Sequence, residues 1–400
     1  MSAPRRRQAG EGSISEYVTK AGRRFLIKYW VTTSDGTRKQ TMKRGFLTRQ
    51  AAAAALREQI SSAEKGQWVE PSKQRLDAYL AEWVAGLRLS PSTIASYAKN
   101  IRLHVNPYLG STVVSRLTGA SVNVWMRKLE ASGRADNKGG LSPRTTRYVF
   151  TILRSALSDA VKEGRLTVNP TDRATPPSPK ESRPPEMQAW TAAELGRFLG
   201  WADARDREIA MGWRLLAATG MRRGEALALR WRDIDLDAGR LAVRRSVGIV
   251  NTKGSGEQVI EGPTKTGRSR VIDLDSGTIS ALRAYRATRG LLALDLVRDS
   301  ALVLGDLDGS HRHPERFSRR FNAYVAHARK ALGPDQLPAI RLHDLRHTHA
   351  TLLLADGVPV KVVSERLGHA SPTITLSVYA HVHPGMGRQA ADRFAALLGG

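Results

Sequence analysis

The chain has 400 residues, of which 41% are hydrophobic, enough for two or three packed domains. It contains no cysteine, which excludes disulfides and thiolate metal sites, and 63 Lys and Arg against 37 Asp and Glu give a formal net charge of +26. This charge indicates a polyanionic partner, most often nucleic acid; a solubility bias or a GC-rich genome that favours arginine is the alternative explanation. The N-terminus lacks the apolar stretch of a signal peptide, and no apolar run reaches the length of a membrane span, so we expect a cytoplasmic protein with no membrane partner.

Residues 11–66 predict a small domain made of a three-stranded sheet and one helix. Its strands are expected over residues 13–18, 25–31 and 39–46. Asp35-Gly36 is a turn signal that joins the last two strands into a hairpin, and Thr48 is a suitable N-cap for an Ala-rich helix that runs to about Ala63. The domain is dense in basic residues, and four of them are candidate DNA contacts: Lys28, Lys39, Lys43 and Arg44.

Residues 72–169 predict an all-helical domain of four helices with apolar residues at three- and four-residue spacing. Ser90-Pro91 and Ser142-Pro143 each combine a serine N-cap with a proline in the first turn, so they mark the starts of the second and fourth helices. We expect the second helix to end at Pro107 with Gly110, the third to run from Ser121 to about Leu129, and the fourth to end at Gly164. Candidate DNA contacts here are Lys99, Arg144, Arg147 and Arg154, although solvated helix faces are an equally simple interpretation of each one.

Residues 170–187 carry six prolines and predict an exposed, extended linker. Residues 188–400 then predict a mainly helical domain with a small antiparallel sheet. In it, Thr191 begins a helix, Thr219-Gly220 interrupts a longer one, residues 241–247 form a strand, and residues 263–272 form a turn with the next strand. The fold class is therefore α+β, in several domains.

Several residues of this last domain have the chemistry to hold a phosphodiester and cleave it. Arg222 precedes a short helical run, where a guanidinium offers two parallel donors to phosphate oxygens. His343 and Arg346 are three residues apart and share a helix face, so one can transfer protons while the other binds phosphate. A metal site at His343 and His347 is a weaker interpretation, because Asp344 replaces the glutamate of the usual zinc motif.

A second group follows the end of another helix. His369 lies in a turn after Gly368, where we expect it to be exposed and free to hydrogen-bond a phosphate oxygen, and Tyr379 comes ten residues later. A tyrosine is about 0.1% ionised at pH 7, so it needs a base and a cationic pocket before it can act as a nucleophile. Lys265, in a turn between two strands, is an acid suited to protonating a departing DNA oxygen, or simply a phosphate contact in a basic loop.

The order Thr219-Gly220-Met221-Arg222, Lys265, His343-x-x-Arg346, Leu367-Gly368-His369 and Tyr379 resembles the tyrosine recombinases of the phage integrase family. The resemblance covers nearly the whole chain: residues 11–66 are similar to an arm-type DNA-binding domain, 72–169 to a core-binding domain, and 188–400 to the catalytic domain. It assigns catalytic roles to Arg222, Lys265, His343, Arg346, His369 and Tyr379, and a supporting role to Glu225.

The resemblance implies a site-specific recombinase that forms a 3′-phosphotyrosine intermediate without any metal or nucleotide cofactor. The implied partners are double-stranded DNA with core and arm sites, three further copies of the chain in a tetramer, and, as candidates, an excisionase and a DNA-bending host factor. The apolar C-terminal residues 387–400 are expected to form a helix that docks on a neighbouring subunit or on its own domain. A topoisomerase of type IB and a DNA-binding regulator without catalysis are alternatives; the N-terminal domain argues against the first and the complete set of residues against the second.

Overall fold

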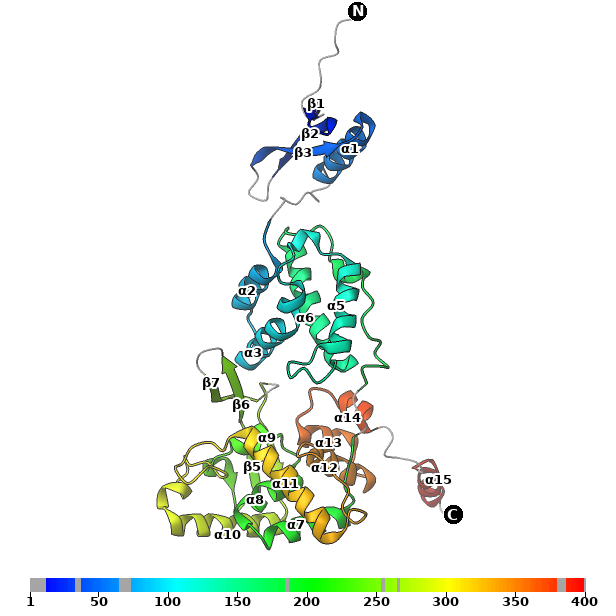
Figure 1. Cartoon of the computed structure of the whole chain (residues 1–400). Helices are drawn as coiled ribbons and strands as arrows, with labels where there is room; N and C mark the ends of the chain where they lie inside the picture. The colour runs from blue at the N-terminus through cyan, green and yellow to red at the C-terminus, as the bar shows by residue number, and fades with distance from the viewer. Residues whose placement is uncertain are drawn as a thin grey trace, which may run out of the picture. The chain divides into compact units, whose positions relative to one another are not determined.

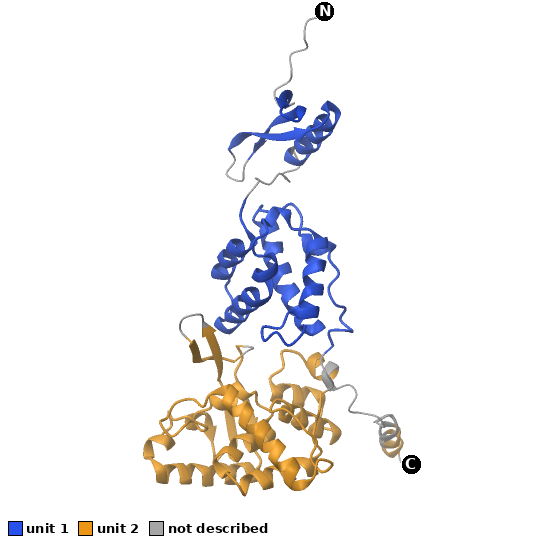
Figure 2. Ribbon diagram, viewed as in Figure 1, with its two compact units in different colours: residues 1–184 blue, residues 185–400 orange. Residues whose placement is uncertain are grey.

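A computed structural model describes residues 12–32, 37–64, 73–183, 187–252, 256–264, 267–379 and 386–398. The chain divides into two compact units, residues 1–184 and 185–400 (Figure 2). Each unit contains both the α-helices and the strands of an α+β fold, with the strands of the first unit confined to its N-terminal part (Figure 1). Within the described ranges, no helix is both long enough and apolar enough to cross a membrane.

The N-terminal part of the first unit is an antiparallel sheet covered by one helix. Its elements are β1 (Ser13–Thr19), β2 (Gly22–Thr32), β3 (Arg38–Phe46) and α1 (Arg49–Glu64), with strand order β1-β2-β3. Alternate residues of β2 are buried because a strand points every second side chain to the same face: Ile27, Tyr29 and Val31 pack with Ala52 and Leu56 of α1. The three strands, the antiparallel pairing of the last two and the helix predicted from the sequence are confirmed, while the predicted turn at Asp35-Gly36 lies outside the described residues.

The rest of the first unit is helical. Its elements are α2 (Leu76–Gly86), α3 (Pro91–Asn100), the π-helix η1 (Ile101–Val105), α4 (Asn106–Leu109), the 3₁₀-helix η2 (Val114–Arg116), α5 (Gly119–Ser132) and α6 (Pro143–Lys162). Ser90 and Ser142 accept hydrogen bonds from Thr93 N and Thr145 N, so the two predicted helix starts are confirmed. The expected end is confirmed at Gly110, the C-cap of α4, but Pro107 does not stop the helix: after the π turn of η1 the chain continues helically to Leu109, with Pro107 in the first turn of α4. The third helix begins earlier than expected, since Thr118 caps it and Ser121 returns the hydrogen bond.

The prolines after α6 are not an exposed spacer over their whole length. Pro170 and Thr171 are buried in the 3₁₀-helix η3 (Pro170–Arg173), and the following segment stays hydrogen-bonded to α5 and α6. The expectation of an exposed linker is therefore wrong for Pro170 and Thr171, while Asp172, Arg173 and Thr175 are exposed as expected. The sequence could not show this, because the contacts that hold the prolines come from residues far away along the chain.

The second unit is mainly helical, with small antiparallel sheets. Its helices are α7 (Ala192–Asp203), α8 (Arg207–Thr219), α9 (Arg223–Leu227), α10 (Ser276–Leu292), α11 (Pro314–Leu332), α12 (Asp344–Ala355), α13 (Val360–Leu367), α14 (Pro372–Tyr379) and α15 (Met386–Leu397), with 3₁₀-helices η4 (Trp231–Asp233) and η5 (Leu294–Val297). The strands form one sheet in the order β4 (Ile234–Asp235), β5 (Arg240–Val243), β8 (Arg270–Asp273), and a separate hairpin of β6 (Arg245–Thr252) and β7 (Gly256–Pro263).

An aromatic cluster holds the helices of this unit together. Phe198 of α7 and Trp213 of α8 pack against Phe321 of α11 with ring centroids 5.3 and 5.6 Å from that of Phe321, and all three are fully buried. The strand expected over residues 241–247 is two strands, because the chain leaves the β5 sheet at Arg244 and enters the β6–β7 hairpin. That hairpin stands out from the helical body of the unit (Figure 1).

Candidate active site

A left-handed glycine brings Arg222 into the site. Helix α8 ends at Gly220, whose φ of +63° suits glycine, and a Cβ there would lie 2.7 Å from both the His349 ring and the Leu367 side chain. The chain can therefore turn tightly beneath α12 and α13 before Arg222 takes the N-cap position of α9. The predicted break at Thr219-Gly220 is confirmed.

Glu225 fixes Arg222 and a second arginine with one buried carboxylate. It is 2% exposed and accepts hydrogen bonds from the backbone N of Arg222 at 2.9 Å, from Arg222 Nη1 at 2.9 Å, and from Arg270 Nη1 and Nη2 at 3.2 and 2.7 Å. Burial raises the pKa of Glu225, but the hydrogen bonds and charges of the two arginines outweigh it and hold the pKa below its usual value. The carboxylate is consequently ionised and orients both guanidinium groups.

Arg270 is a part of this site that the sequence did not single out. It begins strand β8, and its Nε donates to the carbonyl of Arg366 at 2.9 Å while its other nitrogens bind Glu225. Nothing in the run Arg268-Ser269-Arg270 distinguishes the second arginine from the first. A signal is available only in the strand register, which turns Arg270 inward.

Arg346 enters from the first turn of α12. It is 4% exposed, and its Nη1 donates to the carbonyl of Gly220 at 2.7 Å, which ties α12 to the end of α8. His343 immediately precedes the same helix, as expected from the spacing. Burial lowers the pKa of His343, and the charges of Arg346 and Arg222 lower it further. The histidine is therefore neutral near pH 7 and can accept a proton.

His369 lies in the predicted turn between α13 and α14, but it is half-buried rather than exposed. Its Nδ1 is 2.8 Å from Oγ1 of Thr375, which is completely buried, and Arg222 Nη2 donates to the adjacent carbonyl of Gly368 at 3.3 Å. Burial lowers the pKa of His369 to about 4, helped by the charges of Arg346 and Arg222. The hydrogen bond to Gly368 places Arg222 beside the turn that carries His369.

His347 and His349 belong to the support of the site. Nδ1–H of His349 donates to the carbonyl of Ala217 at 2.8 Å, and Nε2 accepts a hydrogen bond from Arg366 Nε at 3.1 Å. The imidazole is therefore neutral, with its proton on Nδ1. Burial lowers its pKa to about 4. The ring of His347 packs edge-on against that of His343, with centroids 5.1 Å apart. No group of three histidine or carboxylate side chains in the described ranges could hold a metal ion.

Two of the predicted site residues cannot be placed by their side chains. Lys265 lies outside the described residues; before it, Thr264 is buried and its hydroxyl donates to the carbonyl of Arg268 at 2.8 Å. Tyr379 is the last residue of α14, and its side chain also lies outside the described part of the structure. The structure thus brings together Arg222, Glu225, His343, Arg346 and His369, and leaves the roles of Lys265 and Tyr379 as predictions.

The N-terminal sheet separates its four candidate DNA contacts onto two faces. Residues directly opposite each other in an antiparallel pair point to the same side, so Lys39 and Lys43, opposite Val31 and Ile27, lie on the face that α1 covers. Lys28 and Arg44 lie on the open face instead. Trp30 lies on that open face too, 44% exposed, with the guanidinium of Arg38 5.6 Å from its ring centroid.

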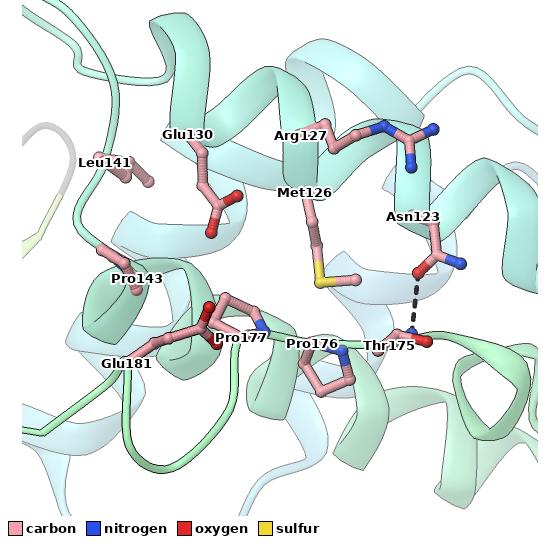
Figure 3. Close-up of a pocket in the computed structure, with 10 residues that line it drawn as sticks. All are labelled: Asn123, Met126, Arg127, Glu130, Leu141, Pro143, Thr175, Pro176, Pro177 and Glu181. Carbon is pink, nitrogen blue, oxygen red and sulfur yellow. Dashed lines mark hydrogen bonds between the residues drawn. The ribbon is translucent and has the colours of Figure 1, made fainter.

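In the helical part of the first unit, two of the candidate arginines hold the proline segment. Arg147 donates to the carbonyl of Pro177, and Arg154 forms an ion pair with Asp172 at 2.8 Å. The backbone N of Thr175 donates to Asn123 of α5 at 2.8 Å, and a cavity of about 690 Å³ remains beside this bond (Figure 3). Lys99 and Arg144 are exposed, and so is Arg154 despite its ion pair with Asp172.

Comparison with known families covers three successive parts of the chain. Residues 191–386 match the phage integrase family, residues 15–63 an arm DNA-binding domain, and residues 73–129 a phage integrase N-terminal SAM-like domain. The chain belongs to the phage integrase family. It is a tyrosine-type site-specific recombinase that acts on DNA, with an N-terminal arm DNA-binding domain and a SAM-like core-binding domain.

Individual relatives are similar to this chain over most of its length. The integrase of Mycobacterium phage D29 is 27% identical over 405 residues, which cover 98% of each chain. Among solved structures, the Tn1549 transposon integrase in complex with a circular intermediate DNA aligns with a TM-score of 0.65 and 19% identity, over 80% of this chain and 99% of that one. A lambda integrase tetramer bound to a Holliday junction aligns with a TM-score of 0.52 and 18% identity, over 93% and 96%. These structures show that the fold is shared.

Proposed function

We propose that this integrase inserts and excises a phage or another mobile element by cutting DNA with Tyr379. The observation that carries the proposal is the convergence of Arg222, Arg346, His343 and His369 from three separate segments: the start of α9, the start of α12 and the turn before α14, the helix that Tyr379 ends. Such a set of cations and neutral imidazoles is suited to a phosphodiester and a phenol.

The two arginines hold the scissile phosphate in this mechanism. Glu225 and the carbonyl of Gly368 fix the guanidinium of Arg222, and the carbonyl of Gly220 fixes that of Arg346, so little reorganisation is needed when negative charge grows on the phosphate oxygens. A preorganised donor of this kind contributes about 2.7–4 kcal/mol to the stability of a transition state.

Proton transfer is divided between the histidines and Lys265. The Tyr379 oxygen forms a bond to phosphorus as the bond to the DNA 5′-oxygen breaks; a neutral histidine takes the phenol proton, and Lys265 gives a proton to the departing oxygen. The product is a 3′-phosphotyrosyl ester and a free 5′-hydroxyl. Thr375 donates to Nδ1 of His369 in this proposal, which leaves Nε2–H to donate to a phosphate oxygen. Religation reverses these steps with the 5′-hydroxyl of a partner strand.

The assembly in the proposal is a homotetramer on two duplexes that carry core and arm sites, and it works without a metal or nucleotide cofactor in the cytoplasm of a bacterial host. The exposed apolar side chains Phe394 and Leu397 of α15, which are 63% and 84% exposed, support docking of this helix on a neighbouring copy. The exposed Lys99 and Arg144 are the proposed core-site contacts. An excisionase and a DNA-bending host factor complete the proposed partners.

A nicked suicide duplex tests the cleavage chemistry. The DNA that flanks the gene supplies the sequence, and the nick next to the cleavage point lets the freed 5′-fragment diffuse away, so that the covalent complex accumulates. We expect the wild type and Tyr324→Phe to form the complex and Tyr379→Phe to bind without forming it; Tyr324 is a fair control because its hydroxyl makes only a 3.4 Å contact with Asp206. Absence of a covalent complex with the wild type would contradict the proposal. Strand exchange between two duplexes then separates a recombinase from a topoisomerase.

A further inference from the structure

A charge cluster holds the β6–β7 hairpin at its base. Glu261 of β7 accepts from Arg230 Nη2 at 2.9 Å, contacts Nε2 of His311 at 2.9 Å, and lies 3.5 Å from Nε of Arg245, which begins β6. Arg245 also pairs with Asp233, a buried carboxylate. One carboxylate on the outer strand therefore joins three cationic or hydrogen-bonding partners.

The partners of Glu261 belong to parts of the catalytic domain that are firmly placed. Arg230 forms a β-bridge with Leu302 and its Nη1 donates to the carbonyl of Ser300 at 3.1 Å. His311 lies in the segment that leads into α11. Arg230 also follows α9, the helix capped by Arg222. One short stretch of backbone therefore carries both Arg222, the proposed phosphate ligand, and Arg230, which anchors the hairpin through Glu261.

The hairpin depends on such anchors because a two-stranded ribbon is marginally stable by itself in water. On β6, Val247 is buried against the core and the Val247 carbonyl approaches Gly224 of α9. On β7, Val259 is partly buried, and Glu261 supplies the polar attachment nearest to the end of the strand. The chain then passes through the buried Thr264 to Lys265, four residues beyond Glu261.

We propose that Glu261 is a positioning residue for Lys265: by binding Arg230 and His311 it fixes the end of β7, four residues before the lysine. This rests on the proposed role of Lys265 as the general acid. Burial raises the pKa of Glu261, but its hydrogen bonds with Arg230 and His311 hold the pKa below its usual value, so the carboxylate is charged when the enzyme works.

A duplex with sulfur in place of the bridging 5′-oxygen separates this role from general support of the fold. A thiolate leaves without protonation, so a defect in delivering the acid disappears on the sulfur substrate, whereas a defect in phosphate binding or folding remains. Single-turnover cleavage of the oxygen and sulfur substrates gives the two rates, and DNA affinity is measured alongside.

We expect Lys265→Ala to slow cleavage of the oxygen substrate by about 10²–10⁴-fold, the usual contribution of general acid–base catalysis, and to cleave the sulfur substrate near the wild-type rate. Glu261→Gln should slow cleavage of the oxygen substrate by at least about 10-fold with unchanged DNA affinity. On the sulfur substrate its cleavage rate should return to near the wild-type value. The matched control is Glu257→Gln: Glu257 lies on the same strand and pairs with His313 at 3.2 Å, but it is eight residues from Lys265 and half-exposed, so both rates should stay at the wild-type level.

His311 provides a second pair of variants in case Glu261→Gln does not fold. His311→Gln keeps a donor for Glu261 and should retain most of the cleavage rate on the oxygen substrate. His311→Ala removes the donor, so it should cleave the oxygen substrate slowly and the sulfur substrate near the wild-type rate. Equal slowing of both substrates by the Glu261 and His311→Ala variants, or no slowing at all, overturns the positioning role. Failure of Lys265→Ala to recover on sulfur instead overturns the proposed acid, so the two proposals fail in different ways.

Discussion

Glu225 contacts Arg222 twice, through the backbone N and through Nη1, both at 2.9 Å. The first hydrogen bond fixes the start of α9, and the second fixes the direction of the guanidinium. Because the same carboxylate also binds Arg270, it balances two arginines in a place where it is itself 2% exposed. The geometry of the proposed phosphate site therefore depends on a residue that need not touch DNA.

Glu225→Gln should impair both stability and cleavage. Removing one charge from a buried ionic cluster costs about 3–5 kcal/mol, because its partners are left uncompensated. A loosened Arg222 should slow cleavage on the order of 10²-fold, the usual effect of a small misplacement in an active site. Denaturant unfolding and suicide-substrate kinetics measure the two effects. Glu315→Gln is the matched control: Glu315 pairs with the neighbouring Arg223 at 3.0 Å but is 53% exposed, so it should cost no more than about 1 kcal/mol.

Gly368→Ala should disturb the site in a way that Gly357→Ala does not. Both glycines have positive φ, +67° and +87°, so both substitutions carry a backbone cost of about 1–2 kcal/mol. A Cβ at Gly368 would lie 2.7 Å from Nη1 of Arg270, however, while a Cβ at Gly357 meets open space. Cleavage should therefore fall in the first variant and stay near normal in the second. Equal activities at equal stability would show that the Arg270 contact is unimportant.

Thr375→Val should slow cleavage with little effect on folding. Valine keeps the volume of this buried side chain but removes the hydroxyl that contacts Nδ1 of His369. We expect about a 10- to 100-fold lower rate, which is part of the roughly 10²–10⁴-fold that a positioned acid–base group supplies. Thr373→Val, two residues earlier and exposed, should cleave at the wild-type rate. An unaffected Thr375→Val enzyme would mean that the imidazole does not need this partner.

The catalytic domain should lose stability as the pH falls from 6.5 towards 4. His349 has a folded-state pKa of about 4 against an ordinary 6.5, because it is buried. In this window the unfolded chain binds more protons than the folded one, so the free energy of unfolding rises with pH. The contribution of His349 is fully present above pH 6.5. His347 and His369, also lowered to about 4, act in the same direction.

Calorimetric melting of the full chain at a series of pH values measures this dependence. His349→Gln should melt at a lower temperature than the wild type at pH 7. Its melting temperature should, however, change less steeply with pH between pH 6.5 and 4.5. His327→Gln is the control, since His327 is exposed on α11 and its replacement should leave the slope as in the wild type. A wild-type melting temperature that does not change across the window would contradict the buried, neutral state of these histidines.

The elements that the sequence predicted well are those with local causes. Ser90, Ser142 and Thr191 each accept the hydrogen bond of a helix N-cap, and Gly220 and Gly368 each adopt the left-handed conformation that ends a helix. These signals lie within a few residues of their effect. The helix starts and ends that these signals mark helped to predict the fold class and the order of the domains.

What the sequence did not predict depends on contacts between distant residues. Arg270 reaches Glu225 across 45 positions, and Arg147 reaches Pro177 across 30, so neither partner is visible in a local pattern. The half-burial of His369 also escaped prediction, because a turn in the sequence does not show which residues pack against it. The π turn before Pro107 also escaped prediction, since a single extra residue in a helix leaves no clear periodicity.

The register of the N-terminal sheet predicts which basic residues bind arm-site DNA. Lys28→Ala and Arg44→Ala remove charges from the open face, so each should weaken binding and reduce the slope of log affinity against log salt by about 1. Lys39→Ala and Lys43→Ala remove the same charge from the face that carries α1, and they should change the slope much less. Titration of a labelled arm-site duplex at several salt concentrations measures all four. If the two pairs proved equivalent, the open face would not be the surface that enters the DNA, because the net charge of the domain is the same in every variant.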